Sequence, residues 1–207
     1  MKLKLVTTTM ILSIACVLFL TRTSTANPGY EVIAIPQKTL SGGKIEVVEV
    51  FWYGCPHCYA LEPQIEKWLD NMPADVEFRR VPGVLGKHWI PHAKAFFVAQ
   101  KLGVLDKIHR PLFDAIHKEK RKIMDPAALR DFFAEHGVDK DTFEKLYNSE
   151  AVEQDMRAAF VAGKEYGIMG VPALIVNGKY RTSPSIAGSY DSVMQIVNQL
   201  IEKERKK

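Results

Sequence analysis

The pair Cys55 and Cys58 offers the clearest chemistry in this sequence of 207 residues. Pro56 and His57 stand between the two cysteines, so the segment reads Cys-Pro-His-Cys. Two thiols at this spacing can form a redox-active disulfide, a structural disulfide or half of a metal site, and with a following histidine they can attach haem. The surrounding residues distinguish among these four kinds of site.

Three of the four kinds of site fit the sequence poorly. Haem attachment requires a histidine directly after the second cysteine, and Tyr59 stands there. A disulfide that closes a loop of four residues stabilises a fold by only about 2 kcal/mol, so it would be a weak structural link. Zinc ligands would have to come from His88 and His92, but 29 residues separate Cys58 from His88, which is more than the spacing of a zinc finger. We therefore expect a catalytic dithiol and no metal.

The elements around the cysteines also favour a catalytic dithiol. Residues 44–52 are rich in valine and alternate between two faces, which predicts a strand. After Gly54 the apolar residues recur with helical spacing, which predicts a helix that begins near Cys55. Pro56 suits the first turn of this helix, whereas Pro63 lies inside it and predicts a kink. The first cysteine is thus expected at a helix N-terminus.

This placement predicts different roles for the two thiols. Free N–H groups and the helix dipole stabilise a thiolate, so the pKa of Cys55 should be lowered and Cys55 should be the nucleophile. Cys58, one turn later on the core side, should be less accessible and act as the resolving thiol. His57 either adds positive charge near the thiolate or is an exposed imidazole without a role. Because a stabilised thiolate favours the reduced protein, the disulfide should pass readily to a substrate.

Two acidic residues are candidates for moving the proton of the buried thiol. Glu49 shares its strand face with apolar residues. It is therefore either an outward-turned residue at a sheet edge or a partly buried proton acceptor close to Cys58. Glu62, on the predicted helix, is a second candidate for the same task or has no such role.

The rest of the chain predicts a sheet interrupted by helices. Residues 76–81 predict a second strand and residues 173–176 a third, which Asn177-Gly178 connects by a hairpin turn to a fourth. Helical patterns fill the segment between the second and third strands, and Ser189 begins a last helix. The two ends of the chain should therefore form one sheet in an α/β fold. The expected parts are a leader at residues 1–26, an N-terminal part at 27–82, an all-helical insertion at 83–166 and a C-terminal part at 167–207.

The N-terminal segment has the composition of a secretory signal peptide. Lys2 and Lys4 precede an apolar stretch at residues 5–20, and small residues at 24–26 stand at the spacing of a cleavage site. The stretch of 16 residues is shorter than the roughly 20 of a membrane-spanning helix, so an uncleaved anchor is the less favoured alternative. Cleavage of the leader would remove Cys16, and export would place the remaining pair, Cys55 and Cys58, in an oxidising compartment.

Composition and charge exclude several classes of protein. With 47% hydrophobic and 25% charged residues, the chain has the composition of a folded globular protein, and extended disorder is excluded. The formal charge is +4, but without the leader 25 basic and 24 acidic residues remain, which gives +1. We therefore expect no nucleic-acid partner.

Taken together, these motifs resemble the DsbA family of periplasmic thiol:disulfide oxidoreductases. The resemblance covers nearly the whole mature chain and rests on Cys55-Pro56-His57-Cys58, the helical block, Gly170-Val171-Pro172-Ala173 and Val176-Asn177-Gly178-Lys179-Tyr180. It implies a thioredoxin fold interrupted by an all-helical insertion. It also implies that Cys55 is the nucleophile and that Glu49 and Glu62 match family acids near the buried thiol.

The resemblance further implies how a substrate binds. Val171-Pro172 should be a cis peptide bond beside the active site, and the backbone of Val171 should pair with an extended substrate segment. We expect Val171, Pro172 and Pro56 to contact the substrate. Such pairing depends little on sequence, which suits an enzyme with many unfolded substrates.

The activity that the resemblance implies is donation of the Cys55–Cys58 disulfide to reduced, unfolded exported proteins in the periplasm. No cofactor beyond this disulfide is expected, and a quinone-linked inner-membrane oxidase of the DsbB type should restore it. We expect a monomer. The alternatives are a disulfide isomerase or reductase, and a non-catalytic thioredoxin-like chaperone. Exported isomerases generally use a separate dimerisation domain, for which the few residues between the leader and the first candidate strand, Asn27 to about Glu31, leave little room.

Overall fold

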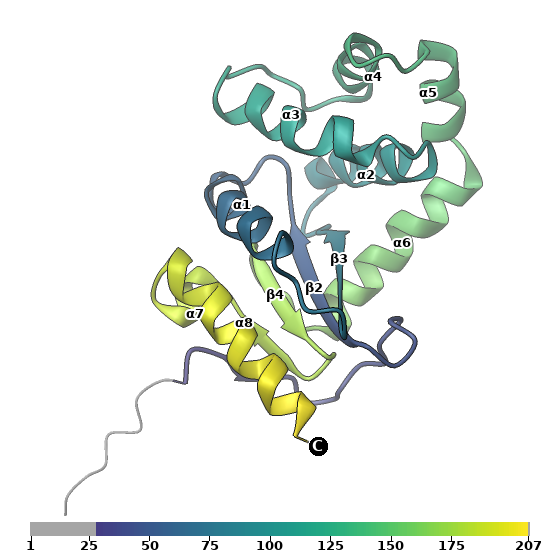
Figure 1. Ribbon diagram of the computed structural model, residues 1–207. Helices are drawn as coiled ribbons and strands as arrows, with labels where there is room; N and C mark the ends of the chain where they lie inside the picture. The colour runs from purple at the N-terminus through teal and green to yellow at the C-terminus, as the bar shows by residue number, and fades with distance from the viewer. Residues whose placement is uncertain (1–27, 207) are drawn as a thin grey trace, which may run out of the picture.

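The computed structural model describes residues 28–206, so the leader predicted at 1–26 lies outside the described residues. Strands and helices occur at both ends of this part, and a run of helices separates the two ends (Figure 1). The elements are β1 (Glu31–Val32), β2 (Ile45–Phe51), α1 (Pro56–Leu69), β3 (Val76–Pro82), a 3-10 helix (Lys87–Trp89), α2 (Ile90–Lys101), α3 (Leu105–His117), α4 (Pro126–Glu135), α5 (Lys140–Tyr147), α6 (Glu150–Glu165), β4 (Ala173–Val176), β5 (Tyr180–Thr182), α7 (Pro184–Ala187) and α8 (Tyr190–Arg205).

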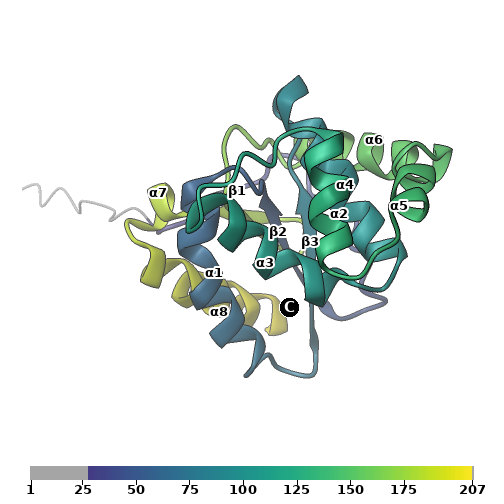
Figure 2. The same ribbon diagram turned by 90° about the horizontal axis from the view of Figure 1, so that it is seen from above.

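The strands of the described residues form one mixed sheet in the order β1-β5-β4-β2-β3. β2 and β3 are parallel, and the other neighbours are antiparallel. Helices α1 and α8 cover one face of the sheet, and α6 packs on the other (Figures 1 and 2). Both faces of β2 are therefore removed from water, which is why a valine-rich segment occupies this inner position.

Helices α2 to α6 form a separate helical layer between β3 and β4 in the chain. In Figure 1, α2 to α5 lie above the end of the sheet at which β2 leads into α1. The side chains of Asp125, Asp139 and Ser149 cap α4, α5 and α6. The apolar core of this layer extends to Cys55 and Cys58. The insertion thus shields one side of the Cys-Pro-His-Cys segment from water.

The predicted hairpin turn at Asn177-Gly178 is confirmed between β4 and β5. Both residues have positive φ angles, 50° and 64°. A Cβ atom on Gly178 would lie 2.1 Å from the carbonyl oxygen of Gln37, so the position requires glycine for space as well as for conformation.

Two short elements were not predicted from the sequence. These are the 3-10 helix and α7, which have three and four residues and are too short to show a period. The first candidate strand, expected after about Glu31, corresponds to β1, which has two residues and pairs with β5. Helices α2 to α6 fall within the insertion predicted at 83–166, whose exact boundaries stay a prediction.

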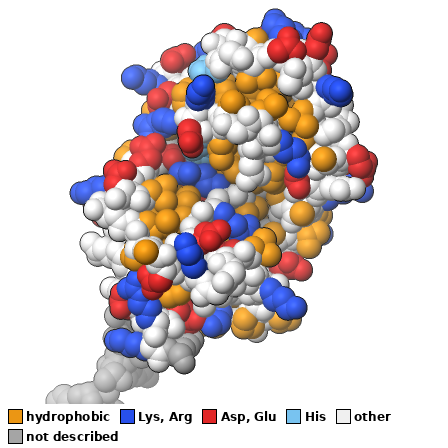
Figure 3. Space-filling model, turned by 45° about the vertical axis from the view of Figure 1, so that its right-hand side comes forward, with side chains coloured by type: hydrophobic (Ala, Val, Ile, Leu, Met, Phe, Trp, Pro, Cys, Tyr) orange, Lys and Arg blue, Asp and Glu red, His pale blue; other side chains and the backbone are white. Residues whose placement is uncertain are grey.

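Charged side chains of both signs are interspersed on the face shown in Figure 3. This distribution agrees with the small net charge expected for the mature chain. Among residues 28–206, no helix has both the length and the apolar composition needed to span a membrane.

Candidate active site

Cys55 lies at the N-terminus of α1, as predicted. The chain leaves β2 at Phe51 and turns, and the N–H of Cys55 donates to the carbonyl oxygen of Trp52 at 2.9 Å. Cys55 is the N-cap residue with extended backbone, and Pro56 is the first residue of the helix. The free N–H groups of the first turn of α1 are therefore available to the Cys55 sulfur.

The Cys55 thiol is unusually acidic. The hydrogen bond from the Cys58 thiol, the N–H groups of Cys58 and His57 and the positive charge of His57 together outweigh burial, and they lower the pKa of Cys55 from 9.0 to about 6. The Cys55 sulfur also lies 3.4 Å from the carbonyl oxygen of Val171, to which the neutral thiol can donate. At neutral pH most of Cys55 is therefore a thiolate.

Cys58 has the opposite properties. Both cysteines are free thiols in this structure. Cys58 is fully buried on the inner face of α1. Burial, the hydrogen bond to Cys55 and the negative charges of Cys55 and Glu49 raise the pKa of Cys58 far above its usual value. At neutral pH the Cys55 thiol is therefore mostly ionised, and the Cys58 thiol stays protonated in the core.

Glu49 and Glu62 are both fully buried, and they share one arginine. Arg80 stands opposite Glu49 in the parallel pairing of β2 with β3. Its Nε donates to Oε2 of Glu49 at 3.0 Å and its Nη2 donates to Oε2 of Glu62 at 3.1 Å. A single positive charge cannot compensate two buried carboxylates, so one of the two is expected to keep its proton. The alternative of Glu49 at a sheet edge is wrong, because β2 lies between β4 and β3.

Tyr53 and His109 determine which carboxyl is ionised. Burial raises the pKa of Tyr53 and lowers that of His109, so both side chains are neutral. Nε2 of His109 faces Oε1 of Glu62 at 3.4 Å, and because a carboxylate oxygen only accepts, the imidazole proton lies on Nε2. Nδ1 then accepts from the Tyr53 hydroxyl, which lies 2.9 Å away. Glu62 thus accepts hydrogen bonds at both oxygens.

The two carboxyl groups therefore have pKa values shifted in opposite directions. Burial would raise the pKa of Glu62, but the hydrogen bond from His109 and the charge of Arg80 hold it below its usual value. In Glu49, burial and the charge of Glu62 outweigh Arg80 and raise the pKa from 4.5 to about 8. Oε1 of Glu49 has no hydrogen-bond partner among the described residues. Near neutral pH, Glu49 holds a proton and Glu62 a negative charge.

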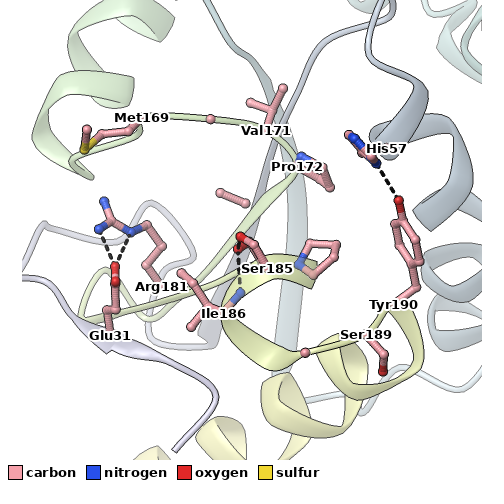
Figure 4. A pocket seen from close by; sticks show the side chains of 15 residues that line it. Glu31, His57, Met169, Val171, Pro172, Arg181, Ser185, Ile186, Ser189 and Tyr190 are labelled. Carbon is pink, nitrogen blue, oxygen red and sulfur yellow. Dashed lines mark hydrogen bonds and ion pairs between the residues drawn. The ribbon is translucent and has the colours of Figure 1, made fainter. Parts of the chain in front are cut away.

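A cavity of about 530 Å³ is lined in part by Val171, whose carbonyl oxygen lies 3.4 Å from the Cys55 sulfur. Figure 4 shows the side chains that line it. The ion pair of Glu31 with Arg181 lies at one end of it and the hydrogen-bonded pair of His57 with Tyr190 at the other (Figure 4). Between these ends the lining is mainly apolar and includes Met169, Val171, Pro172, Pro184 and Ile186. Its length and its apolar middle suit an extended chain segment.

The residues predicted to bind substrate fall into two groups. Val171 and Pro172 line the cavity, and the peptide bond between them is cis, as the resemblance implies. His57 also lines the cavity, with Nδ1 at 2.7 Å from the hydroxyl of Tyr190. Pro56 is exposed at the start of α1 and does not line the cavity. A contact of Pro56 with substrate stays a prediction.

The sequence analysis missed Arg80, His109 and Tyr190. Arg80 had no signal of its own, because the predicted strand at residues 76–81 also contains Glu77 and Arg79. The pairing that sets Arg80 opposite Glu49 was not available from the pattern. Tyr190 is 133 positions from His57, and no local spacing connects the two.

Comparisons with known proteins agree with this geometry. The family model of the DSBA-like thioredoxin domain matches residues 46–200. The thiol:disulfide interchange protein DsbA of Azotobacter vinelandii is 47% identical over 163 residues, which cover 79% of this chain and 76% of the relative. The protein of the same name from Pseudomonas aeruginosa is 44% identical over 181 residues, with 87% and 86% covered.

The solved structures that resemble this chain include DsbA proteins. The crystal structure of Pseudomonas aeruginosa DsbA has a TM-score of 0.82 and 43% sequence identity, and the match covers 86% of this chain and 93% of the other. The structure of the oxidoreductase DsbA from Xylella fastidiosa has a TM-score of 0.81 at 32% identity, covering 86% and 96%. The expected thioredoxin fold with a helical insertion is therefore confirmed. The chain belongs to the DsbA-like thioredoxin family of thiol:disulfide oxidoreductases.

Proposed function

We propose that this protein donates its Cys55–Cys58 disulfide to reduced proteins exported to the periplasm. The observation that carries the proposal is the contrast between the two thiols, because the pKa of Cys55 is lowered to about 6 and that of Cys58 is raised. Stabilising the Cys55 thiolate stabilises the reduced protein relative to its disulfide. The disulfide is therefore a strong oxidant, and transfer to a substrate is its favourable direction.

The reaction proceeds through a mixed disulfide at Cys55. A substrate thiolate attacks the Cys55 sulfur, the Cys55–Cys58 bond breaks, and Cys58 leaves with the electron pair and takes up a proton. A second substrate thiolate then attacks the substrate sulfur of the mixed disulfide, and Cys55 leaves as a thiolate. The substrate loses two thiols and gains one disulfide, and the protein becomes the dithiol. If the second substrate thiol is absent, Cys58 attacks Cys55 and releases the reduced substrate.

Glu49 is the proposed proton source for the departing Cys58 sulfur. Its pKa of about 8 means that it carries a proton at neutral pH. Once Glu49 loses this proton, its negative charge raises the pKa of Cys58, so the two groups are close enough to interact electrostatically. Burial and the negative charge of Glu62, which stays ionised, keep that proton on Glu49 against the opposing charge of Arg80. When the dithiol is reoxidised, Glu49 takes the proton back.

Substrate binding is assigned to the cavity beside Val171 and Pro172. The carbonyl oxygen of Val171 lies 3.4 Å from the Cys55 sulfur, so a chain paired with this backbone brings its own cysteine close to Cys55. The apolar middle of the cavity accepts the apolar side chains that unfolded proteins expose. Such a site selects for an extended and unfolded chain and only weakly for its sequence.

The cellular setting completes the proposal. The leader at residues 1–26 directs export and is cleaved, and the mature protein acts in the periplasm as a monomer with no cofactor other than its disulfide. A quinone-linked inner-membrane oxidase of the DsbB type accepts the two electrons of the dithiol. The names of the relatives, thiol:disulfide interchange proteins, support the substrate class.

The reduction potential of the Cys55–Cys58 pair tests this function. The mature protein is equilibrated in glutathione buffers of graded ratio, and free thiols are counted by the mass added on alkylation. The double variant Cys55→Ala, Cys58→Ala is the control for non-specific alkylation. We expect a potential well above that of thioredoxin, about −270 mV. A value near thioredoxin's would instead assign a reductase or isomerase.

Mixing the oxidised protein with a reduced, unfolded substrate separates the enzyme from a chaperone. An oxidase forms substrate disulfides in stoichiometric amount without added oxidant. Unchanged thiol counts would contradict the proposal.

A further inference from the structure

Tyr190 contacts the active-site histidine at one end of the cavity. Its hydroxyl lies 2.7 Å from Nδ1 of His57, and the two rings are stacked with centroids 6.4 Å apart and an angle of 26° between their planes. Figure 4 shows the two side chains pointing toward each other at the end of the cavity opposite Glu31 and Arg181. Within residues 28–206, the hydrogen bond and the ring contact of this imidazole both go to Tyr190.

The tyrosine is held in place by its own surroundings. Tyr190 is the first residue of α8, which the Ser189 side chain caps through a hydrogen bond from the N–H of Ser192. Its half-buried ring packs against the apolar core between α1, α8 and the sheet. His57 is exposed, so the tyrosine is the fixed member of the pair and the imidazole the mobile one.

The contact survives a change in the charge of the imidazole. When His57 is neutral with its proton on Nε2, Nδ1 accepts a hydrogen bond from the Tyr190 hydroxyl. When His57 is protonated, Nδ1–H donates to the hydroxyl oxygen instead. A hydroxyl can both donate and accept a hydrogen bond, whereas an apolar side chain does neither and an acceptor side chain cannot donate. The ring is therefore held in one place in both charge states.

We propose that Tyr190 is a positioning residue for the dithiol. Its hydroxyl holds the His57 imidazole at its end of the cavity, where the imidazole charge acts on the Cys55 sulfur. Without the hydroxyl, an exposed imidazole rotates among several rotamers, most of them further into solvent, where its charge is screened. The inference rests on the proposed function, and it assigns part of the oxidising strength of the disulfide to a residue outside the Cys-Pro-His-Cys segment.

The test is a double-mutant cycle on the reduced mature protein. Cys55 ionisation is followed by thiolate absorbance against pH in wild type, Tyr190→Phe, His57→Ala and the double variant. Phenylalanine keeps the ring that packs on the core and removes only the hydroxyl. We expect the acid dissociation constant of Cys55 to fall about threefold in Tyr190→Phe. In the His57→Ala background the same change should have no effect, because Tyr190 acts through the imidazole.

Tyr30→Phe is the matched control. It removes a tyrosine hydroxyl that accepts a hydrogen bond from Lys203 at 3.0 Å, at a residue that does not line the cavity. An unchanged Cys55 titration in Tyr190→Phe, or an equal shift with and without His57, would overturn the inference. Oxidation of a reduced substrate by wild type is measured alongside. Its failure would count against the proposed function, whereas the titration cycle reports on Tyr190 whether or not a substrate is oxidised.

Discussion

Replacing Glu49 with glutamine should change how the stability of the fold depends on pH. In the folded protein Glu49 keeps its proton up to a pKa of about 8, whereas its usual pKa is 4.5. Between these values the unfolded chain binds fewer protons, so the free energy of unfolding falls as pH rises. The contribution is fully present below about pH 4.5 and is lost as pH passes about 8. A shift of this size corresponds to at most about 5 kcal/mol.

Urea unfolding between about pH 5 and about pH 8 measures this loss. The Cys55→Ala background is required, because the thiolate of Cys55 stabilises the reduced protein in the opposite direction over part of the same range. Glu62 does not interfere, since its lowered pKa affects stability only at lower pH. Glutamine keeps a carbonyl oxygen for the hydrogen bond from Arg80 and removes the titration. We expect the decline with pH to become several kcal/mol smaller in Glu49→Gln.

Glu46→Gln is the control variant for this experiment. Glu46 is a second buried carboxylate of β2, paired with Arg79 at 2.9 Å and remote from the dithiol. If Glu46→Gln flattened the pH dependence as much as Glu49→Gln does, or if Glu49→Gln left it unchanged, the assignment of the shared proton to Glu49 would be refuted.

The remaining predictions concern the dithiol and its arginine. Cys58→Ala should accumulate mixed disulfides through Cys55, because the resolving thiol is missing; a non-reducing gel without substrate adducts would contradict this role. His57→Ser should raise the pKa of Cys55 above about 6, and an unchanged thiolate absorbance titration would remove the imidazole from the mechanism. The reduced protein should melt above the oxidised one. Because the pKa of Cys55 falls from 9.0 to about 6 on folding, this advantage should vanish as pH falls through 6 and grow as pH rises toward 9. Above pH 9 the raised pKa of Cys58 should reduce it again, and calorimetry of both forms can check this profile. Arg80→Met leaves buried negative charge uncompensated and should lower the free energy of unfolding by about 3–5 kcal/mol. A loss below about 1 kcal/mol in urea unfolding would show that the two carboxyl groups do not require the charge of Arg80.

Features of the site that depend on neighbouring residues were predictable. Cys55 at the N-terminus of α1, and therefore its acidic thiol, follows from the change from strand to helical spacing and from Pro56 in the first turn. The caps at Asp139 and Ser149 and the hairpin turn after β4 follow from residue types within a few positions. In each case the deciding hydrogen bonds or φ angles lie within one turn of the chain.

The charge states inside the site were not predictable in this way. Both Glu49 and Glu62 were candidates for moving a proton, and the sequence offered no reason to prefer one. Their difference depends on the register that sets Arg80 opposite Glu49 and on the packing of α3, which brings His109 to Glu62. Burial and the charge of Glu62 raise the pKa of Glu49, whereas the hydrogen bond from His109 and the charge of Arg80 hold that of Glu62 below its usual value.

The sequence by itself determined that this protein has a reactive dithiol at a helix N-terminus and a sheet interrupted by helices, because these depend on local spacing. Only the tertiary structure decided what surrounds the dithiol. It places Val171 beside Cys55 across 116 positions and Tyr190 against His57 across 133. The physical reason is that contacts between distant segments are set by strand register and side-chain packing over the whole fold, and the electrostatic strength of those contacts is set by the exclusion of water.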